Sequence, residues 1–162
     1  MVYYTRKKGR DKTMKTIWFD MDGTLGNLYA VENWLSMLRA YDPTPYAEAE
    51  VMLNMSLLAR YLNRLQKAGY QIGIISWLSK VPDPAYDEAV TEAKLEWLEI
   101  HLHSVSWDVI NIVPYGTPKS SFKTSADDIL FDDEENNRKE WDGEAYEPDQ
   151  IMEILKEILR GE

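Results

Sequence analysis

Hydrophobic residues in this chain form short apolar runs that alternate with longer stretches in which they recur at helical spacing. The apolar runs indicate buried strands at residues 16–19, 70–76, 107–113 and 128–131, with a fifth, very short strand at 143–146. Helical spacing indicates helices at residues 28–41, 46–68, 85–103 and from Pro148 onward. This alternation favours a parallel sheet covered by helices on both faces. We therefore predict one α/β domain, a three-layer α/β/α sandwich of Rossmann-like type.

The predicted domain covers residues 14–162, because no linker or repeat interrupts the pattern. Residues 1–13 hold five basic residues and one acidic residue, a net charge of +4, so the remaining 149 residues carry −14 of the total of −10. This basic tail either contacts an anionic partner or is a non-native or disordered extension before a natural start at Met14. We favour the second interpretation.

Polar residues stand at or just past the carboxyl ends of the predicted strands, the edge at which open parallel sheets bind ligands. They are Asp20 and Asp22 in "DMDGT", Ser76 after "IGII", Lys119 in the loop 114–121, and Asp132 and Asp133 after "DILF". Residues that are far apart in the sequence should therefore meet along one edge of the sheet.

The chemistry of these residues points to phosphoryl transfer. Several carboxylates in one place repel each other unless a cation joins them, and a ligand set of oxygen atoms without His or Cys favours Mg²⁺. A lysine and a serine beside them suit a phosphate group. One aspartate would attack phosphorus, and the other, two residues on, would protonate the leaving oxygen.

The stretch "DMDGT" after an apolar strand resembles the first motif of the haloacid dehalogenase (HAD) superfamily of phosphohydrolases, and Ser76, Lys119 and "ILFDD" match the other three motifs in order. The resemblance implies a HAD-like fold with Asp20 as nucleophile. Asp22 would be the general acid and base, and its backbone carbonyl would contact Mg²⁺. Asp133 would bind the metal directly, and Asp132 would do so or orient the site.

We expect Thr24, Ser76, Trp77 and Lys119 to contact the substrate. The resemblance implies that Ser76 would hydrogen-bond the phosphoryl oxygens and that Lys119 would neutralise the charge developing on them. Two positions stay open. Lys123 competes with Lys119 for the lysine motif, and Asn137 stands where these phosphatases often have a further acid.

Each of these residues also has a purely structural interpretation. Asp20 with Asp22, and separately Ser76, could cap a turn or helix; Lys119 could be a solvated loop residue, and residues 132–137 an acidic turn. The joint occurrence of the motifs favours the catalytic interpretation. His101 and His103 lie late on a predicted helix beside Trp97 and Leu98, and we interpret both as structural.

The segment between Asp22 and Ser76 has room for a small helical cap at about 27–50. Aromatic residues lie there or directly after Ser76: Tyr29, Trp34, Tyr41, Tyr46 and Trp77. They could stack on a nucleobase, although Trp34 could equally be a core residue. A small cap with aromatic residues resembles the 5'(3')-deoxyribonucleotidases, which implies a nucleoside monophosphate as substrate. A polynucleotide end, a phosphotransfer acceptor other than water, and a non-catalytic regulatory role stay open.

Composition narrows these alternatives. The chain has 162 residues, 44% hydrophobic and 28% charged, which suits one globular domain. It has no cysteine, which excludes disulfides and thiolate metal sites. A net charge of −10 disfavours binding to nucleic acid. No apolar run reaches the roughly 18 residues that a membrane span requires. We expect a cytoplasmic enzyme that acts on a small phosphorylated substrate.

Overall fold

The computed structural model describes residues 2–5 and 15–161. The basic residues between positions 6 and 12, on which the prediction of an anion-binding tail depends, lie outside the described residues. Residues Val2–Thr5, which we had placed in that tail, form strand β1.

The sheet has six strands in the order β1-β4-β3-β2-β5-β6. Five of them run parallel to one another: β4 (Val109–Val113), β3 (Gln71–Trp77), β2 (Thr16–Phe19), β5 (Ile129–Phe131) and β6 (Ala145–Tyr146). β1 pairs with β4 in the antiparallel sense at one edge. The predicted parallel sheet and the very short fifth strand are confirmed, whereas β1 was not predicted.

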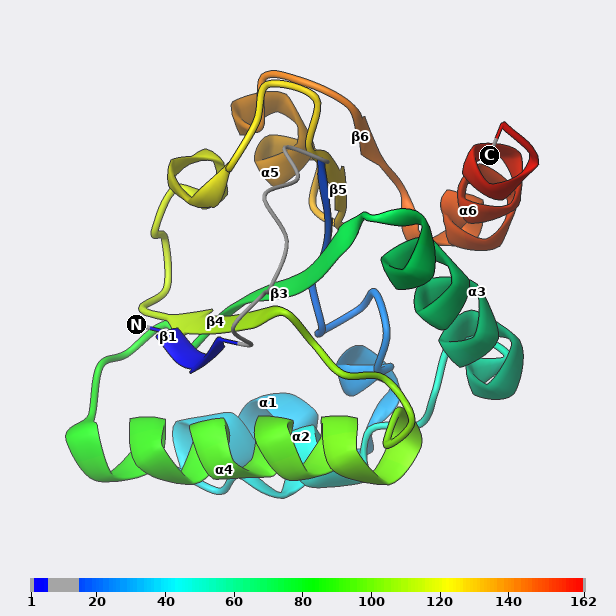
Figure 1. The fold of residues 1–162 in the computed structure, drawn as a ribbon. Coiled ribbons are helices and arrows are strands. Elements are labelled where there is room, and N and C mark those ends of the chain that lie inside the picture. The colour runs from blue at the N-terminus through cyan, green and yellow to red at the C-terminus, as the bar shows by residue number, and fades with distance from the viewer. Residues whose placement is uncertain (1, 6–14, 162) are drawn as a thin grey trace.

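One face of the sheet carries most of the core. It is covered by three helices, α3 (Met55–Ala68), α4 (Pro84–His101) and α6 (Ile151–Arg160), as Figure 1 shows. Ile17 and Phe19 of β2 and Ile74 of β3 point into this layer and are fully buried. Burial of apolar side chains of this size stabilises the fold by about 1.5–3 kcal/mol each.

The opposite face has a thinner cover. Trp18 and Leu130 point to this side and pack with Trp141, which follows the short helix α5 (Glu135–Glu140). Phe122, at the end of the 3-10 helix η2 (Lys119–Phe122), lies partly buried against the same cluster. The predicted three-layer α/β/α class is therefore confirmed. The helical layer on this face of the sheet consists of α5 and η2.

The segment after β2 folds into three short helices, η1 (Leu28–Ala30), α1 (Trp34–Arg39) and α2 (Thr44–Glu48). We had predicted one continuous helix over 46–68, and this is wrong. The chain leaves the helical conformation at Ala49, and α3 begins afresh after Asn54, whose side chain accepts a hydrogen bond from the Leu57 amide at 3.1 Å.

Two backbone hydrogen bonds explain this break. The Asn27 amide donates to the Glu50 carbonyl at 2.8 Å, and the Met52 amide donates to the Leu25 carbonyl at 3.0 Å. Residues 49–52 therefore pair with the turn after β2 and cannot continue the helix of α2. Residues 27 and 50, which bound the segment of three short helices, are therefore held side by side.

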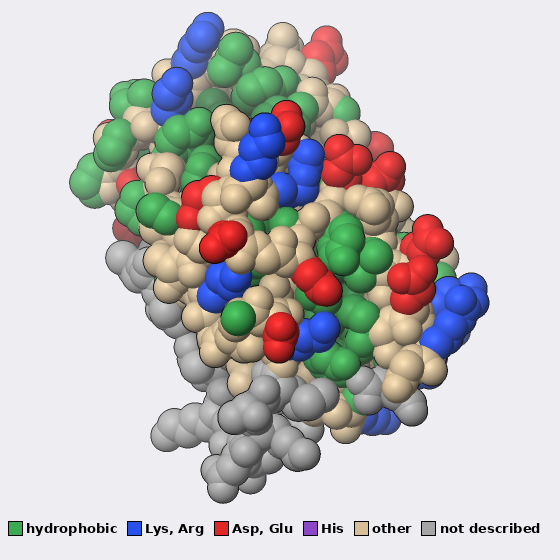
Figure 2. All heavy atoms as spheres, turned by 90° about the horizontal axis from the view of Figure 1, so that it is seen from above, with side chains coloured by type: hydrophobic (Ala, Val, Ile, Leu, Met, Phe, Trp, Pro, Cys, Tyr) green, Lys and Arg blue, Asp and Glu red, His purple; other side chains and the backbone are tan. Residues whose placement is uncertain are grey.

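The surface of the described residues carries both signs of charge. On the face shown in Figure 2, basic side chains are interspersed with acidic and hydrophobic ones. Within the described ranges 2–5 and 15–161, no helix combines the length and the apolar character that crossing a bilayer requires.

Candidate active site

The turn after β2 directs two aspartates toward one cavity. The Asp20 amide donates to the Phe131 carbonyl at 2.9 Å, so the pairing of β2 with β5 continues to the first aspartate. Met21 is buried in the core, whereas Asp20 and Asp22 on either side of it line the same cavity. The alternation of side chains in an extended chain explains this arrangement. The prediction that both carboxylates point to one side of the strand end is confirmed.

Gly23 lets this turn approach the end of β5. Its φ of +80° lies in the left-handed region, and a Cβ atom there would lie 2.4 Å from Oδ2 of Asp133. Glycine adopts this conformation without steric cost, and any side chain would collide with the carboxylate. The glycine of "DMDGT" is therefore required by the close packing of two strand ends.

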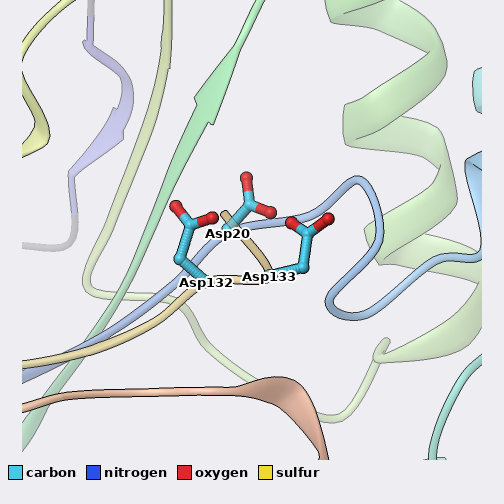
Figure 3. A group of neighbouring side chains, drawn as sticks. All are labelled: Asp20, Asp132 and Asp133. Atoms are coloured by element: carbon cyan, nitrogen blue, oxygen red, sulfur yellow. The ribbon is translucent and has the colours of Figure 1, made fainter. Parts of the chain in front are cut away.

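Three carboxylates meet at these strand ends. One oxygen from each of Asp20, Asp132 and Asp133 lies within 4.8 Å of the others, and Figure 3 shows the three groups directed to the same side. Burial and the charge of Asp20 raise the pKa of Asp133 to about 8 and that of Asp132 to about 6. Burial is the first cause of both shifts, and the positive charge within the protein does not offset it.

Lys119 supplies part of that charge. Its Nζ donates to Oδ1 of Asp20 at 2.9 Å and to Oδ2 of Asp132 at 2.7 Å, and the side chain is only 1% exposed. Burial would lower the pKa of Lys119, but the two carboxylates raise it above its ordinary value. Lys123 instead donates to the carbonyls of Trp141 and Asp142. The structure therefore brings Lys119, and not Lys123, to the carboxylates.

Asp132 is held on several sides within the protein. Besides Lys119, its carboxylate accepts hydrogen bonds from the Glu134 amide at 2.9 Å and from Nδ2 of Asn137 at 3.1 Å. An acid at position 137 would place a further negative charge against Asp132, whereas the amide of Asn137 donates to it. The missing acid of the family pattern thus has a physical reason in this chain.

Thr24, which we had expected to contact the substrate, is fully buried. Its hydroxyl donates to Oδ2 of Asp20 at 2.9 Å and accepts from the Asp133 amide at 3.2 Å. The side chain therefore joins the two strand ends and fixes the Asp20 carboxylate, and it does not line the cavity.

Lys94 is a site residue that the sequence analysis missed. Its Nζ donates to Oδ2 of Asp22 at 2.9 Å, to Oγ of Ser76 at 2.6 Å and to the Trp77 carbonyl at 2.7 Å. The available signal was its position on α4, where it lies between the buried Val90 and Trp97 on the apolar stripe. A lysine on an apolar stripe needs a buried partner.

Burial raises the pKa of Asp22, and Lys94 opposes this effect. Ser76, at the end of β3, is fully buried, and Asp22 keeps 22% of its side chain exposed to the cavity. The structure thus brings Asp22 and Ser76 together through a lysine that neither sequence motif contains.

A cavity of about 270 Å³ opens beside Asp20 and Lys119. Two aromatic pairs line it: Tyr29 with Trp34, whose ring centroids are 5.0 Å apart, and Trp77 with Tyr115, at 4.9 Å. Tyr46 also lines it, whereas Tyr41 packs on Tyr86 elsewhere.

The two histidines lie away from this cavity. His101 stacks on Trp97 with ring centroids 4.5 Å apart, and His103 is exposed. Their placement agrees with the structural interpretation.

The charges of the site fit a divalent cation. The charged side chains of the site form two groups: Asp22 with Lys94, and Asp20, Asp132 and Asp133 with Lys119. Four carboxylates and two ammonium groups leave a formal charge of −2. In the described part of the chain, no lysine or arginine pairs with Asp133. Carboxylate oxygens with this surplus charge are the ligands that Mg²⁺ prefers.

Comparison with known proteins identifies the fold. No family model and no curated protein matches the chain. A crystal structure described as that of a HAD-like phosphatase from Mesorhizobium loti matches with a TM-score of 0.57 and 17% identity, covering 90% of this chain and 78% of that chain. At this identity the match shows the fold, so the chain has a HAD-like fold and the predicted resemblance is confirmed at that level.

Two further structures match with lower TM-scores. D,D-heptose 1,7-bisphosphate phosphatase from Burkholderia thailandensis has a TM-score of 0.46 and 20% identity, over 77% of this chain and 70% of that chain. The HAD domain of the effector protein Lem4 from Legionella pneumophila has a TM-score of 0.46 and 16% identity, over 91% and 94%.

Proposed function

We propose that this chain, whose fold is HAD-like, is a Mg²⁺-dependent phosphomonoester hydrolase that acts through an aspartyl-phosphate intermediate. One observation carries the proposal. The carboxylate of Asp20 is oriented by hydrogen bonds to both of its oxygens, from Lys119 and Thr24, and it lies in a group of three carboxylates at the mouth of a cavity.

Asp20 and Asp133 would hold the metal with their carboxylates, and Asp22 with its backbone carbonyl. Asp132 is less available, because its oxygens already accept hydrogen bonds from Lys119, Asn137 and the Glu134 amide. We therefore assign Asp132 to orienting the site. When bound, the metal neutralises the charge of the phosphate and of the nucleophile.

In the first half of the reaction, an oxygen of Asp20 attacks phosphorus and the ester P–O bond breaks. Asp22 gives its proton to the leaving oxygen, so that the product leaves as a neutral alcohol. In the second half, water attacks phosphorus, Asp22 takes its proton, and the bond between phosphorus and Asp20 breaks to release phosphate. General acid catalysis of this kind contributes about 10²- to 10⁴-fold.

The remaining residues would bind the phosphoryl group and the alcohol. Lys119 neutralises charge that develops on the phosphoryl oxygens. Ser76, which we had expected to donate a hydrogen bond to them, is fully buried and does not line the cavity. Trp77 is fixed by a hydrogen bond from its Nε1 to the Thr117 carbonyl at 2.9 Å and faces the cavity together with Tyr115.

We further propose a nucleoside monophosphate as the substrate. Its support is the pair of aromatic contacts on the cavity wall, Tyr29 with Trp34 and Trp77 with Tyr115. A nucleobase can stack on such rings, and stacking of one base contributes about 1–3 kcal/mol. The cavity beside the carboxylates would then take the base while Asp20 faces the phosphate.

Hydrolysis of p-nitrophenyl phosphate with and without MgCl₂ tests the reaction. We expect Mg²⁺-dependent turnover that falls by about 10⁴-fold in Asp20→Asn, which lacks the nucleophile. Asp127→Asn is the matched control, because Asp127 is exposed and close to β5 in sequence but does not line the cavity. Wild-type turnover no higher than that of Asp20→Asn, across a range of divalent metals, would refute the proposal.

A phosphomonoester panel with deoxynucleoside monophosphates tests the substrate. Tyr115→Ala should raise KM for the preferred nucleotide by about 5- to 100-fold, the equivalent of one lost stacking contact. Tyr41→Ala is the control, because Tyr41 is exposed to 52%, as Tyr115 is to 51%, but packs on Tyr86 outside the cavity. Equal rates for all bases and sugars would remove the nucleotide proposal and leave the hydrolase intact.

A further inference from the structure

Lys94 uses its whole donor capacity inside the protein. An ammonium group has three N–H donors and no acceptor, and Lys94 directs them to Asp22, Ser76 and the Trp77 carbonyl at distances of 2.6–2.9 Å. The side chain is 1% exposed. Burial of a lysine is costly unless its charge is paired and hydrogen-bonded, and the contacts of Lys94 meet both conditions.

The partners of Lys94 distinguish a role in the site from a general structural role. A lysine that only attached α4 to the sheet could use any carbonyl or carboxylate on β3 or β4. Two of its contacts, with Oγ of Ser76 and the Trp77 carbonyl, lie on β3 and would serve that purpose, whereas the third, with Asp22, reaches the turn after β2. Lys94 thus connects the end of β3 with the turn after β2.

These contacts decide which atoms remain for a ligand. Because Lys94 can only donate, Oγ of Ser76 must accept, and the Ser76 hydroxyl hydrogen is then free to donate elsewhere. No acceptor for it occurs among the residues that the structure describes, but Ser76 is fully buried and does not line the cavity. Likewise, Oδ2 of Asp22 is occupied by Lys94, whereas Oδ1 has no hydrogen-bond partner in ranges 2–5 and 15–161.

Lys94 itself is closed off from the ligand. Its Nζ lies 5.0 Å from the centroid of the Tyr46 ring on α2, and Lys94 does not line the cavity. A phosphate group in the cavity would therefore meet Asp22 and not the ammonium group. This arrangement suits a residue that acts through its neighbours.

We propose that Lys94 is a positioning residue that holds Oδ2 of Asp22 and so turns Oδ1 of this carboxylate toward the leaving group. The inference rests on the proposed function, because it assigns a cause to the geometry of one of its residues. It adds to the reaction a residue outside all four sequence motifs.

The test compares the wild-type protein with Lys94→Met, which removes the donors and keeps an unbranched side chain of similar length. Thr91→Val is the matched control. Thr91 is also buried on α4, one turn earlier, and its hydroxyl donates to the Asp87 carbonyl of the same helix at 2.7 Å. Two substrates are used at saturating MgCl₂: p-nitrophenyl phosphate, whose leaving group needs no proton, and glycerol 2-phosphate, whose leaving group does.

We expect Lys94→Met to lower kcat for glycerol 2-phosphate by about 100-fold, the scale of general acid catalysis. The kcat for p-nitrophenyl phosphate should fall by only about tenfold. In an Asp22→Asn background, Lys94→Met should cost less than about threefold, because the two residues act as one unit. An equal loss for both substrates, or an undiminished loss in the Asp22→Asn background, would overturn the proposal.

Binding of inorganic phosphate, measured by calorimetry with MgCl₂, provides a readout without turnover. Lys94→Met should leave the affinity within about threefold of the wild-type value, because Lys94 does not line the cavity and acts through Asp22. A loss of about tenfold or more would show that the lysine supports phosphate binding itself and would contradict the proposed role.

Phosphate binding without any turnover would refute the proposed hydrolase activity. The role of Lys94 would then be tested by the phosphate measurement alone. If Lys94→Met does not fold, Lys94→Arg keeps the charge and several donors. It should lose more activity with glycerol 2-phosphate than with p-nitrophenyl phosphate, and a uniform loss would count against the proposal.

Discussion

Strand β5 has a buried aspartate at each end, and the two ends surround it differently. At the amino end, the carboxylate of Asp128 accepts hydrogen bonds from the Thr16 amide at 2.8 Å, the Trp18 indole at 3.0 Å, and the amide and hydroxyl of Thr124 at 2.7 and 3.0 Å. At the carboxyl end, Asp132 and Asp133 face Asp20, and one lysine lies between Asp132 and Asp20.

The difference separates a structural carboxylate from the carboxylates of the candidate active site. Neutral N–H and O–H donors fill the acceptor positions of Asp128 and join β2, β5 and the loop at Thr124. Asp108 before β4 is held through Oδ2, which accepts from the Ile72 amide and from Gln66. Neutral donors thus hold the carboxylates at the amino edge of the sheet, whereas Asp20, Asp132 and Asp133 at the carboxyl edge face one another and one lysine.

The largest effect should come from Lys119→Met at the carboxyl end. It leaves Asp20 and Asp132 buried without their shared cation, and loss of one partner from a buried ion pair costs about 3–5 kcal/mol. Urea unfolding with and without MgCl₂ measures this cost, and Mg²⁺ should restore part of it. Lys123→Met is the control and should cost about 1 kcal/mol, since Lys123 donates to two backbone carbonyls. Equal losses would show that the carboxyl end has no special charge deficit.

The second effect is a pH-dependent stabilisation by Mg²⁺. The pKa of Asp133 is raised to about 8 and that of Asp132 to about 6, through burial and the charge of Asp20. Without metal, the two carboxyl groups stabilise the folded protein below about pH 4, which is near the ordinary pKa of an aspartate. This contribution is lost as the pH rises through 6 and 8.

Mg²⁺ competes with those protons, so its effect should grow over the same interval. Melting curves from pH 5 to 9 should show little stabilisation by Mg²⁺ at the acidic end and about 2.7 kcal/mol at the alkaline end when Mg²⁺ is at 100 times its Kd. In Asp133→Asn this pH dependence should largely disappear. A constant effect of Mg²⁺ at every pH would argue against metal binding by these carboxylates.

The third effect concerns the amino end. Asp128→Asn replaces one acceptor oxygen by an NH₂ group that must face N–H donors, which should cost about 1–3 kcal/mol in urea unfolding. Turnover per folded molecule should stay at the wild-type level, in contrast to Asp20→Asn. If Asp128→Asn abolished turnover while remaining folded, the two ends of β5 would not differ in the way described here.

The smallest effect is expected for Gly23→Ala. The left-handed backbone alone costs a side chain about 1–2 kcal/mol. Gly116→Ala is a close control, because Gly116 has a φ of +86° but a Cβ there meets nothing within 4 Å, whereas at Gly23 it meets Asp133. Both variants should lose stability, and only Gly23→Ala should also bind Mg²⁺ more weakly in a titration. Identical Mg²⁺ affinities would show that Asp133 is not a ligand.

The sequence predicted best what is local in the chain. An apolar run followed by a polar residue marks both the strand and its carboxyl end, so β2, β3 and β5 and their residues Asp20, Ser76 and Asp132 were predictable. The shared sheet edge then follows from parallel topology. Lys94 was not predicted, because its role depends on which strand end the middle of α4 contacts.

Other features also depended on long-range packing. The interruption between α2 and α3 arises from hydrogen bonds of residues 50 and 52 with the turn at 25–27, which helical periodicity does not reveal. Asn137 departed from the family pattern, and only its contact with Asp132 explains why an amide is suitable there. Thr24 looked like a substrate contact because it follows the aspartates, whereas the packing of two strand ends buries it.

The hydrogen bonds from Asn27 to Glu50 and from Met52 to Leu25 also hold the two ends of residues 27–50 together at one point of the core. The segment leaves and rejoins the core at the same point, so its interior can change while the carboxylates stay in place. Doubling the length of a flexible loop between fixed ends costs only about 0.6 kcal/mol. Under the proposed function, a change inside this segment would therefore alter the substrate while the carboxylates and their chemistry stay the same.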